Sequence, residues 1–396
     1  MDAMTLQQLR AETPGCAQRI HLNNAGASLP PQTVLHTMQD YLALEAEIGG
    51  YEAADAKASE IAGFYTAVAR LLGAHPRNIA FAGSATDAYA RALSAIPFQT
   101  DDVILTTEND YVSNQIAFLA LEKHRGLRIV RARDSAAGGV ELEDFADLLK
   151  KRQPRLVAVT HVPTNSGLVQ PVAAIGQLCR AQGTWYLVDA CQSAGQLPLD
   201  VEQIGCDFLT ATLRKFLRGP RGGGFLYVSD RVLEAGLEMA IPDMRSAHWT
   251  AANTYVPAPD ARRFEYWEMA PAIVLGSKVA VEYALQVGLA QIETRVKSLA
   301  DFTRQQLQTL PGVRVLDQGE QLCGIVTAHA EAWQPQALLN QLAARRINCR
   351  TSPLCVAQLD FPRKGVEWAL RISPHYYNTE EEIIRTIETL REGSGG

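Results

Sequence analysis

The sequence predicts an α/β protein: a large domain whose mostly parallel sheet is covered by helices, followed by a small α+β domain at the C-terminal end. Strand and helix patterns alternate regularly from about residue 79 to 228, which is typical of a parallel sheet covered on both faces. From about residue 289 shorter strands and helices alternate. The 396 residues, 47% of them hydrophobic and 20% charged, suffice for two domains with a large core.

The domains and their elements follow from this pattern. We expect an N-terminal arm over 1–20 that joins the small domain, a large domain over 21–270 and a small domain over 271–396. Helices are predicted at 5–11, 32–41, 58–72, 140–149, 272–287, 291–310, 335–346 and 380–390. Strands are predicted at 103–106, 127–132, 155–160, 225–228, 313–315 and 324–328. The stretch 242–259 is predicted to be loop, and the glycines and serine of 393–396 a flexible tail.

Two further strands carry the most informative residues. One apolar run ends at Asp189 and, after a crossover, a second leads to Lys215. Each charge is therefore expected at the carboxyl end of a strand, where ligands bind in open α/β sheets. Such a pair suits pyridoxal phosphate, because lysine forms a Schiff base with its aldehyde while the carboxylate keeps its pyridine nitrogen protonated. Each residue alone would be a solvated lysine or a cap, but the polar neighbours Gln192, Thr212 and Arg214 favour the cofactor.

With these neighbours, the stretch resembles the class V aminotransferase family of fold-type I pyridoxal-phosphate enzymes, which includes cysteine desulfurases and C–S lyases. The resemblance covers nearly the whole chain in family order. It implies these roles: Lys215 as the Schiff-base lysine, Asp189 at the pyridine nitrogen, Gln192 at the ring hydroxyl, and Thr212 and Arg214 at the phosphate. Desulfurases more often have serine and histidine at the last two positions, and Leu213 stands where glycine is common.

A turn of small residues after the strand near residue 80 leads directly into a helix. The backbone N–H groups at such a helix start suit a phosphate, whereas the alternative is plain capping by Ser84 or Thr86. The family resemblance implies a phosphate cup at Ser84, Ala85 and Thr86.

The resemblance also implies a substrate side. The small-residue loop before residue 30 would line it with Asn24, Ala25 and Gly26, whereas the residues alone indicate a turn that leads into the next helix. Family members usually have an asparagine at the position of Thr164, so either Thr164 or Asn165 could contact cofactor and substrate. His161, just before them, is predicted to be structural.

Two more positions complete the predicted site. Arg371 matches the family arginine that grips the substrate α-carboxylate through two parallel hydrogen bonds; the alternative is a surface salt bridge. Tyr111 stands where desulfurases have a histidine stacked on the cofactor ring, and is predicted to be a cofactor-contacting and catalytic residue. A tyrosine can stack there equally well, but it cannot shuttle a proton near neutral pH as histidine does. The alternative for Tyr111 is a half-buried side chain at a strand end.

The predicted reaction is a β-elimination by a C–S lyase on a cysteine derivative. Segments around His161, Lys215 and His375 resemble a subgroup described as isopenicillin-epimerase-like or as the sulfoxide lyase of ergothioneine synthesis. Aminotransferase, cysteine desulfurase and amino-acid epimerase are the alternatives, and a cofactor-free binding protein with the same fold is the non-enzyme alternative. The run from Arg350 to Cys355 is similar to the loop that carries the nucleophilic cysteine of one desulfurase group, or else Cys355 is one of seven scattered thiols.

Composition limits the partners. The net charge of -6 and the lack of a basic run make nucleic acid and anionic membrane unsuitable partners, and no apolar run reaches the length of a membrane span. The first residues lack a secretory-signal pattern, and the seven cysteines lack metal-ligand spacing, so we expect a cytoplasmic protein without a bound metal. A small amino-acid substrate and a homodimer are predicted. No threonine follows Phe264 and Glu265, where desulfurases lend one to the partner's phosphate.

Overall fold

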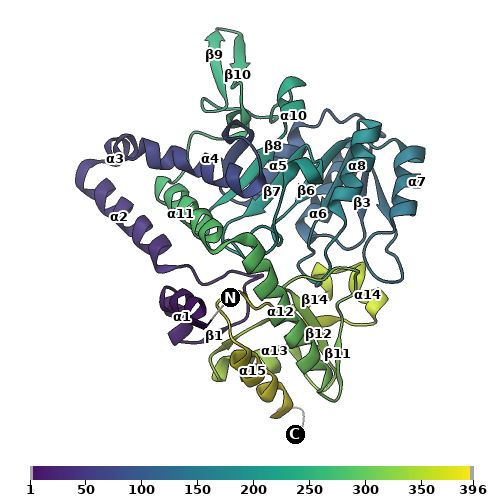
Figure 1. Cartoon of the computed structure of the whole chain (residues 1–396). Coiled ribbons are helices and arrows are strands. Elements are labelled where there is room, and N and C mark those ends of the chain that lie inside the picture. Colours follow the sequence, from purple (N-terminus) through teal and green to yellow (C-terminus); the bar gives the residue numbers. More distant parts are fainter. Residues whose placement is uncertain (1–2, 393–396) are drawn as a thin grey trace.

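A seven-stranded sheet forms the centre of the larger part of the molecule (Figure 1). The computed structural model describes residues 3–392, and the predicted tail at 393–396 lies outside them. The strands lie in the order β2 (Ile79–Ala82), β8 (Gly224–Val228), β7 (Phe208–Thr212), β6 (Trp185–Asp189), β5 (Leu156–Thr160), β3 (Val103–Thr107) and β4 (Arg128–Ala132). Strands β4, β3, β5, β6 and β7 pair in parallel, while β8 runs antiparallel to both of its neighbours. The mostly parallel sheet is thus confirmed.

Both faces of this sheet are covered. Along β5, Val157 and Val159 belong to one hydrophobic cluster, and Leu156 and Ala158 belong to the other. A strand buried on both faces needs a continuous apolar run instead of alternating apolar and polar residues. Such runs are the reason that β5, β6 and β7 could be predicted from the sequence. The covering helices are α5 (Ala85–Ala95), α6 (Val112–Arg125), α7 (Leu142–Arg152), α8 (Val172–Gln182), α9 (Val201–Ile204) and α10 (Asp230–Glu234).

A layer of long helices lies along one side of the larger part. Helix α11 (Pro271–Val287) packs against α2 (Gln32–Ile48) and α4 (Ala58–Leu72), and α3 (Gly50–Ala56) joins the last two. The helix predicted at 32–41 continues to Ile48, where Gly49 ends it with a positive φ of 101°. Short 3-10 helices are η1 (Pro14–Ala17), η2 (Pro76–Asn78), η3 (Ala261–Phe264) and η4 (Leu354–Val356).

The smaller part, at the bottom of Figure 1, contains an antiparallel sheet of four strands. Their order is β11 (Val313–Val315), β12 (Val326–Ala330), β15 (Trp368–Ile372) and β14 (Arg350–Pro353). Its helices are α12 (Leu289–Gln308), α13 (Pro335–Ala344), α14 (Asp360–Lys364) and α15 (Glu380–Glu392). After α1 (Ala3–Ala11), strand β1 (Ile20–His21) pairs in parallel with β13 (Ile347–Asn348), which ties the N-terminal segment to this part. The domain limits given above stay a prediction.

One stretch differs from the expectation. The predicted loop at 242–259 contains a hairpin of β9 (Ala247–Ala251) and β10 (Thr254–Pro257), which projects from the top of the molecule in Figure 1. Most of its residues are exposed on both faces. Without a buried face there is no alternation of apolar and polar residues, which is the signal that predicts a strand.

Over the described residues, no single helix is long and apolar enough to cross a bilayer. Helices α11 and α12 pass that test of length and composition only as a pair, bent by 80° at the break between them.

Candidate active site

Lys215 lies at the carboxyl edge of the large sheet. It follows the end of β7, beside the end of β6 at Asp189. Its side chain is buried, and its Nζ lies 5.8 Å from the centre of the Tyr111 ring. Burial lowers the pKa of Lys215, and the nearby Arg214 lowers it further, against the attraction of Asp189. An amine with a lowered pKa is more often neutral, as a nucleophile or base must be.

Asp189 is held by N–H donors on both carboxylate oxygens. Oδ1 accepts from the backbone of Cys191 at 2.9 Å, and Oδ2 accepts from Asn114 Nδ2 at 3.0 Å. The Asn114 amide also donates to Thr160 Oγ1 at 3.2 Å. Sequence reasoning missed Asn114, because an asparagine in the first turn of α6 has no periodic signal.

Tyr111 immediately precedes α6, and the side chain of its neighbour Asp110 holds its backbone. Its N–H donates to Asp110 Oδ1 at 2.6 Å. Asp110 also accepts from Thr160 Oγ1 and from Gln115 Nε2, and its burial raises the pKa of its carboxyl. The Tyr111 ring lies beside Lys215, and its stacking on a cofactor ring stays a prediction.

Thr164, Gln192 and Arg371 meet on the other side of the site. Gln192 Nε2 donates to Thr164 Oγ1 at 2.7 Å and to the Ala25 carbonyl at 3.0 Å. Arg371, on β15, donates from Nη1 to Thr164 Oγ1 at 2.9 Å and from Nη2 to Asn23 Oδ1 at 3.2 Å. These predicted site residues are far apart in the sequence, and the structure brings them together between the large sheet and the small sheet. Burial, with nearby Arg214 and Arg350, lowers the pKa of Arg371 to about 10.

Three polar atoms of this region are buried without a hydrogen-bond partner. They are Gln192 Oε1, Asn165 Oδ1 and Arg371 Nε. A buried donor or acceptor left unpaired costs about 1–3 kcal/mol, so such atoms are expected where a ligand will pair them. Two acceptors and one guanidinium N–H fit a ligand that carries both donor groups and an anion.

The predicted phosphate cup lies at the same sheet edge. Gly224 of β8 is in register with Thr212 on one side and Ala82 on the other, two residues before Ser84. A Cβ on Gly224 would lie 2.7 Å from the Ser84 carbonyl carbon, so only glycine allows this close approach. Ser84 caps α5, with Oγ accepting from Asp87 N at 3.1 Å, which is the alternative stated for it above. Ala85, the first residue of α5, is buried, and Thr86 is exposed.

Arg214, a predicted phosphate ligand, contacts the loop of the substrate side. Its Nη1 donates to the Gly26 carbonyl, and its own carbonyl accepts from Ser28 N at 2.9 Å. It therefore binds the loop 24–28 of the substrate side. Thr212 Oγ1 lies 3.5 Å from the Gly223 carbonyl.

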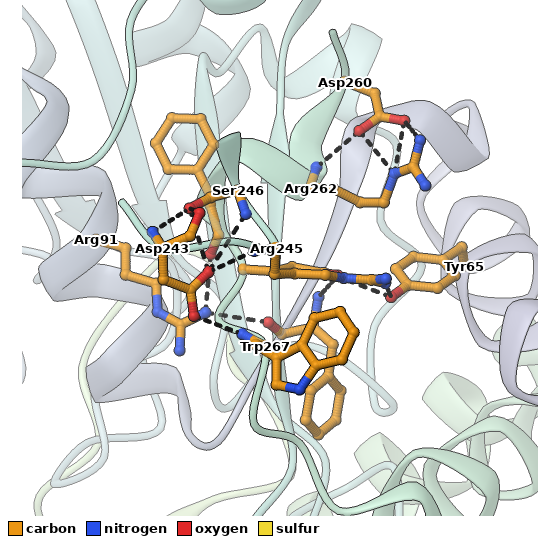
Figure 2. Close-up of polar contacts among 11 residues, drawn as sticks. Tyr65, Arg91, Asp243, Arg245, Ser246, Asp260, Arg262 and Trp267 are labelled. Atoms are coloured by element: carbon orange, nitrogen blue, oxygen red, sulfur yellow. Dashed lines mark hydrogen bonds and ion pairs between the residues drawn. The ribbon is translucent and has the colours of Figure 1, made fainter. Parts of the chain in front are cut away.

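A polar network binds the backbone of β2, the strand that leads to the cup. Figure 2 labels three of its members, Tyr65, Arg91 and Arg245. We call its members the anchor network: Tyr65, Arg91, Arg245 and Glu265. The fully buried Glu265 accepts from Phe81 N at 2.8 Å, Arg245 Nε at 2.9 Å and Tyr65 OH at 3.1 Å. Figure 2 shows Arg245 directed at Tyr65, whose OH lies 3.1 Å from Arg245 Nη2.

Arg91 completes the anchor network from α5. Its Nη1 donates to the carbonyls of Phe81 and Phe264, and its Nε donates to Asp87 Oδ1. The segment around residue 264 is thus bound to β2 at Phe81 on both backbone groups. No motif predicted this network, since its members come from four separate segments. The one local signal in the sequence is the spacing of four residues between Asp87 and Arg91, which allows an ion pair on one helix face.

Cys355 is the exposed member of the seven cysteines, all of which are free thiols. It lies in η4 and lines a cavity together with Asp110 and Asn165. Among residues 3–392, no group of three or more His, Cys, Asp or Glu side chains is arranged to hold a metal ion.

The chain is similar to known proteins over almost its entire length. The family model described as Aminotransferase class-V matches residues 20–385. A relative from Methanothermobacter thermautotrophicus, described as a "Probable cysteine desulfurase", is 26% identical over 99% of this chain and 99% of its own. A relative from Mycobacterium tuberculosis, described as a "Probable hercynylcysteine sulfoxide lyase", is 30% identical over 96% of this chain and 91% of its own.

The solved structure of a cysteine desulfurase from Thermococcus onnurineus NA1 has a similar fold. It superposes with a TM-score of 0.89 and 23% sequence identity, covering 98% of this chain and 97% of that one. This likeness confirms the predicted fold class.

Proposed function

The chain belongs to the aminotransferase class V family, and we propose that it is a pyridoxal-phosphate-dependent enzyme that breaks a C–S bond in a cysteine derivative. The observation that carries this proposal is the buried Lys215 amine, which faces the Tyr111 ring at the same sheet edge as Asp189. The names of the two relatives, a desulfurase and a sulfoxide lyase, support sulfur chemistry.

The residues present fit pyridoxal phosphate. The unpaired Gln192 Oε1 can accept from a ring hydroxyl, and the fixed carboxylate of Asp189 suits a protonated pyridine nitrogen. The close approach of Gly224 to Ser84 leaves backbone groups at the start of α5 for a phosphate, with Ala85 and Thr86 as its first residues. We assign Thr212 to the same phosphate, with Arg214 shared between it and the loop at Gly26.

The bound cofactor would supply an electron sink for the α-carbon of the substrate. Lys215 Nζ would take the α-proton, for which its lowered pKa is suited. Arg371 would hold the substrate carboxylate, and Thr164 fixes the Arg371 guanidinium from the large domain. When the Cβ–S bond breaks, the electron pair would leave with sulfur, which takes up a proton. The three-carbon fragment that keeps the amino nitrogen would then take up water to give pyruvate and ammonia.

A cysteine desulfurase is the second candidate, because one observation favours it. The exposed Cys355 lines a cavity together with Asn165, next to Thr164. A desulfurase would transfer the sulfur to this thiol and release alanine instead of pyruvate.

We also propose that two copies of the chain associate. Apolar side chains that single-copy proteins usually bury are exposed between residues 241 and 267: Ile241, Met244, Trp249, Tyr255 and Trp267. Seven free cysteines suit a reducing compartment, so we assign the protein to the cytoplasm.

Two variants of the holoenzyme test the reaction. Lys215→Ala should lose the visible absorption of the lysine-bound cofactor and lower kcat by about 10³-fold or more. Cys355→Ala should retain most of the turnover of an S-substituted cysteine, with pyruvate and ammonia as products. If Cys355→Ala stops sulfur release and the wild type forms alanine, the enzyme is a desulfurase. A Lys215→Ala protein that keeps both the absorption and the activity would overturn the cofactor assignment.

A further inference from the structure

A cavity of about 320 Å³ lies between the start of α6 and the segment 355–360. Val112, Ile116 and Leu119 of α6 form one apolar wall, and Val356 and Leu359 lie on the other side. Its size falls in the range of small-molecule sites. Asn165 borders both this space and the substrate side, and the rest of the space is not used by the roles assigned above to the cofactor or to the substrate amino acid.

The cavity adjoins the proposed catalytic residues. Asp110 and Asn165 both line it, and they are the direct chain neighbours of Tyr111 and Thr164. The thiol-bearing Cys355 lines it from the small domain. A group attached to the sulfur of a bound cysteine derivative would therefore have space in this direction.

Two buried atoms in the lining have no partner, and both are hydrogen-bond acceptors. They are Asn109 Oδ1 and Asn165 Oδ1, on side chains that are 3% and 1% exposed. Each unpaired acceptor costs about 1–3 kcal/mol until a donor reaches it. A ligand that brings N–H groups would recover that energy, whereas a carboxylate would not.

The charged groups of the lining agree with this preference. Glu108 and Asp360 contribute carboxylates, which form ion pairs with Arg363 and Lys364. Among the described residues that line the cavity, Arg131 is the one cation, and it already donates from Nε and Nη2 to Gln115 Oε1 at 3.0 and 2.8 Å. An anionic ligand would therefore find carboxylates and amide oxygens in the cavity and an arginine that is already engaged.

We propose that this cavity binds the sulfur substituent of the substrate, and that it selects an apolar linker ending in a protonated amine. This inference rests on the proposed C–S lyase function and deepens it by naming the substrate class.

The first experiment compares three sulfoxides of S-substituted L-cysteines that have substituents of similar length: 2-aminoethyl, propyl and 2-carboxyethyl. Pyruvate release by the holoenzyme gives kcat/KM for each. We expect the order aminoethyl, propyl, carboxyethyl, with the first about 10- to 100-fold above the last, as one or two hydrogen bonds to a charged group would give. Equal values, or the opposite order, would overturn the inference.

A charge in the cavity wall should change this preference. Ile116→Lys places a cation on the solvent-accessible edge of the wall, since Ile116 is 61% exposed, and should lower the aminoethyl-to-carboxyethyl ratio at least 10-fold. Ile384→Lys, at a 40% exposed position on α15, is the matched control and should leave the ratio unchanged. If the two variants give the same ratio, the cavity is not the selective site.

A binding readout separates this inference from the proposed reaction. Cys355 lines the cavity and is exposed, so its alkylation by iodoacetamide, followed by mass spectrometry, reports occupancy. S-(2-aminoethyl)-L-cysteine should slow the alkylation at least fivefold, and S-(2-carboxyethyl)-L-cysteine should not. Turnover without this protection refutes the cavity assignment alone. Protection without turnover of any of the three sulfoxides refutes the lyase and retains the cavity.

Discussion

The anchor network and the substrate side differ in how completely their buried polar groups are paired. In the anchor network, the Glu265 carboxylate accepts three hydrogen bonds, and the Arg91 guanidinium donates to two carbonyls and a carboxylate. On the substrate side, Gln192, Asn165 and Arg371 each keep one buried atom without a partner. Both regions contain a buried arginine, Arg91 in the anchor network and Arg371 on the substrate side.

The cavity beside each of the two regions shows the same difference in the pairing of polar groups. A cavity of about 580 Å³ beside the anchor network is lined by Arg77, Arg245 and Arg262, and each of these arginines is ion-paired. The smaller cavity beside Asn165 contains two unpaired acceptors. Space alone does not indicate a ligand, whereas unpaired buried atoms do. Unpaired atoms also occur elsewhere, as at His161 Nδ1, so the pairing must be read together with the location.

The largest effect should come from the anchor network. Glu265→Ala leaves the Arg245 guanidinium and the Phe81 N–H without their buried partner, and should lower the free energy of unfolding by about 3–5 kcal/mol in urea denaturation. Glu202→Ala is the matched control, because Glu202 pairs with Arg180 through side chains that are both exposed, and it should cost less than about 1 kcal/mol. Equal losses in the two variants would show that the anchor network adds no stability.

For Arg371 the main effect is expected on activity. Arg371→Ala removes the proposed carboxylate ligand and should lower kcat/KM by about 10²- to 10³-fold, mostly through KM. The loss of its hydrogen bonds to Thr164 and Asn23 should lower the unfolding free energy by about 1–3 kcal/mol, less than in Glu265→Ala. Arg371→Lys keeps a charge but not the paired N–H geometry, so it should recover only part of the loss. Steady-state kinetics on one cysteine derivative check this. An unchanged KM in Arg371→Ala would remove Arg371 from the substrate site.

The sequence predicted the residues that end strands, because that position follows from the apolar runs alone. Asp189 and Lys215 lie at the expected sheet edge, and Thr164 and Arg371 meet although 207 positions separate them. The family resemblance, not the spacing of residues, brought Arg371 into the prediction.

What the sequence did not predict are the contacts between distant segments. Asn114, Arg91 and Glu265 act through partners that no periodic pattern connects. The sequence assigned Arg214 to the phosphate and did not predict the contact between its guanidinium and the Gly26 carbonyl, which lies 188 positions away. The hairpin of β9 and β10 was missed because it buries no face.

His161 has a buried, unpaired Nδ1 and no proposed catalytic role, so its replacement tests the effect of such a group on stability alone. Burial lowers the pKa of His161 to about 4, whereas an unfolded chain binds this proton near pH 6.5. Above pH 6.5 the imidazole is neutral in both states and protonation costs the folded state nothing. As the pH falls from 6.5 towards 4, the free energy of unfolding should decrease by about 3 kcal/mol, because the unfolded chain binds the proton and the folded chain does not. His161→Gln should remove this part of the acid destabilisation in urea denaturations between pH 7 and 4. His124→Gln, on an exposed position of α6, should not, and equal curves for the two variants would contradict the assignment.

The smallest expected effect is an increase in the free energy of unfolding, and its sign distinguishes an unpaired buried group from a paired one. Asn165→Leu removes a buried acceptor that has no partner, at a position where the side chain makes no hydrogen bond that must be replaced, and should raise the free energy of unfolding by up to about 1 kcal/mol. Asn114→Leu is the matched control, because the Asn114 amide donates to Asp189 and Thr160, and it should lower that free energy by about 1–3 kcal/mol. Both measurements use urea denaturation of the cofactor-free protein, so that binding does not contribute. If Asn165→Leu destabilises the chain as much as Asn114→Leu, the unpaired oxygen is paired in solution without a ligand, and the contrast between the two regions does not hold.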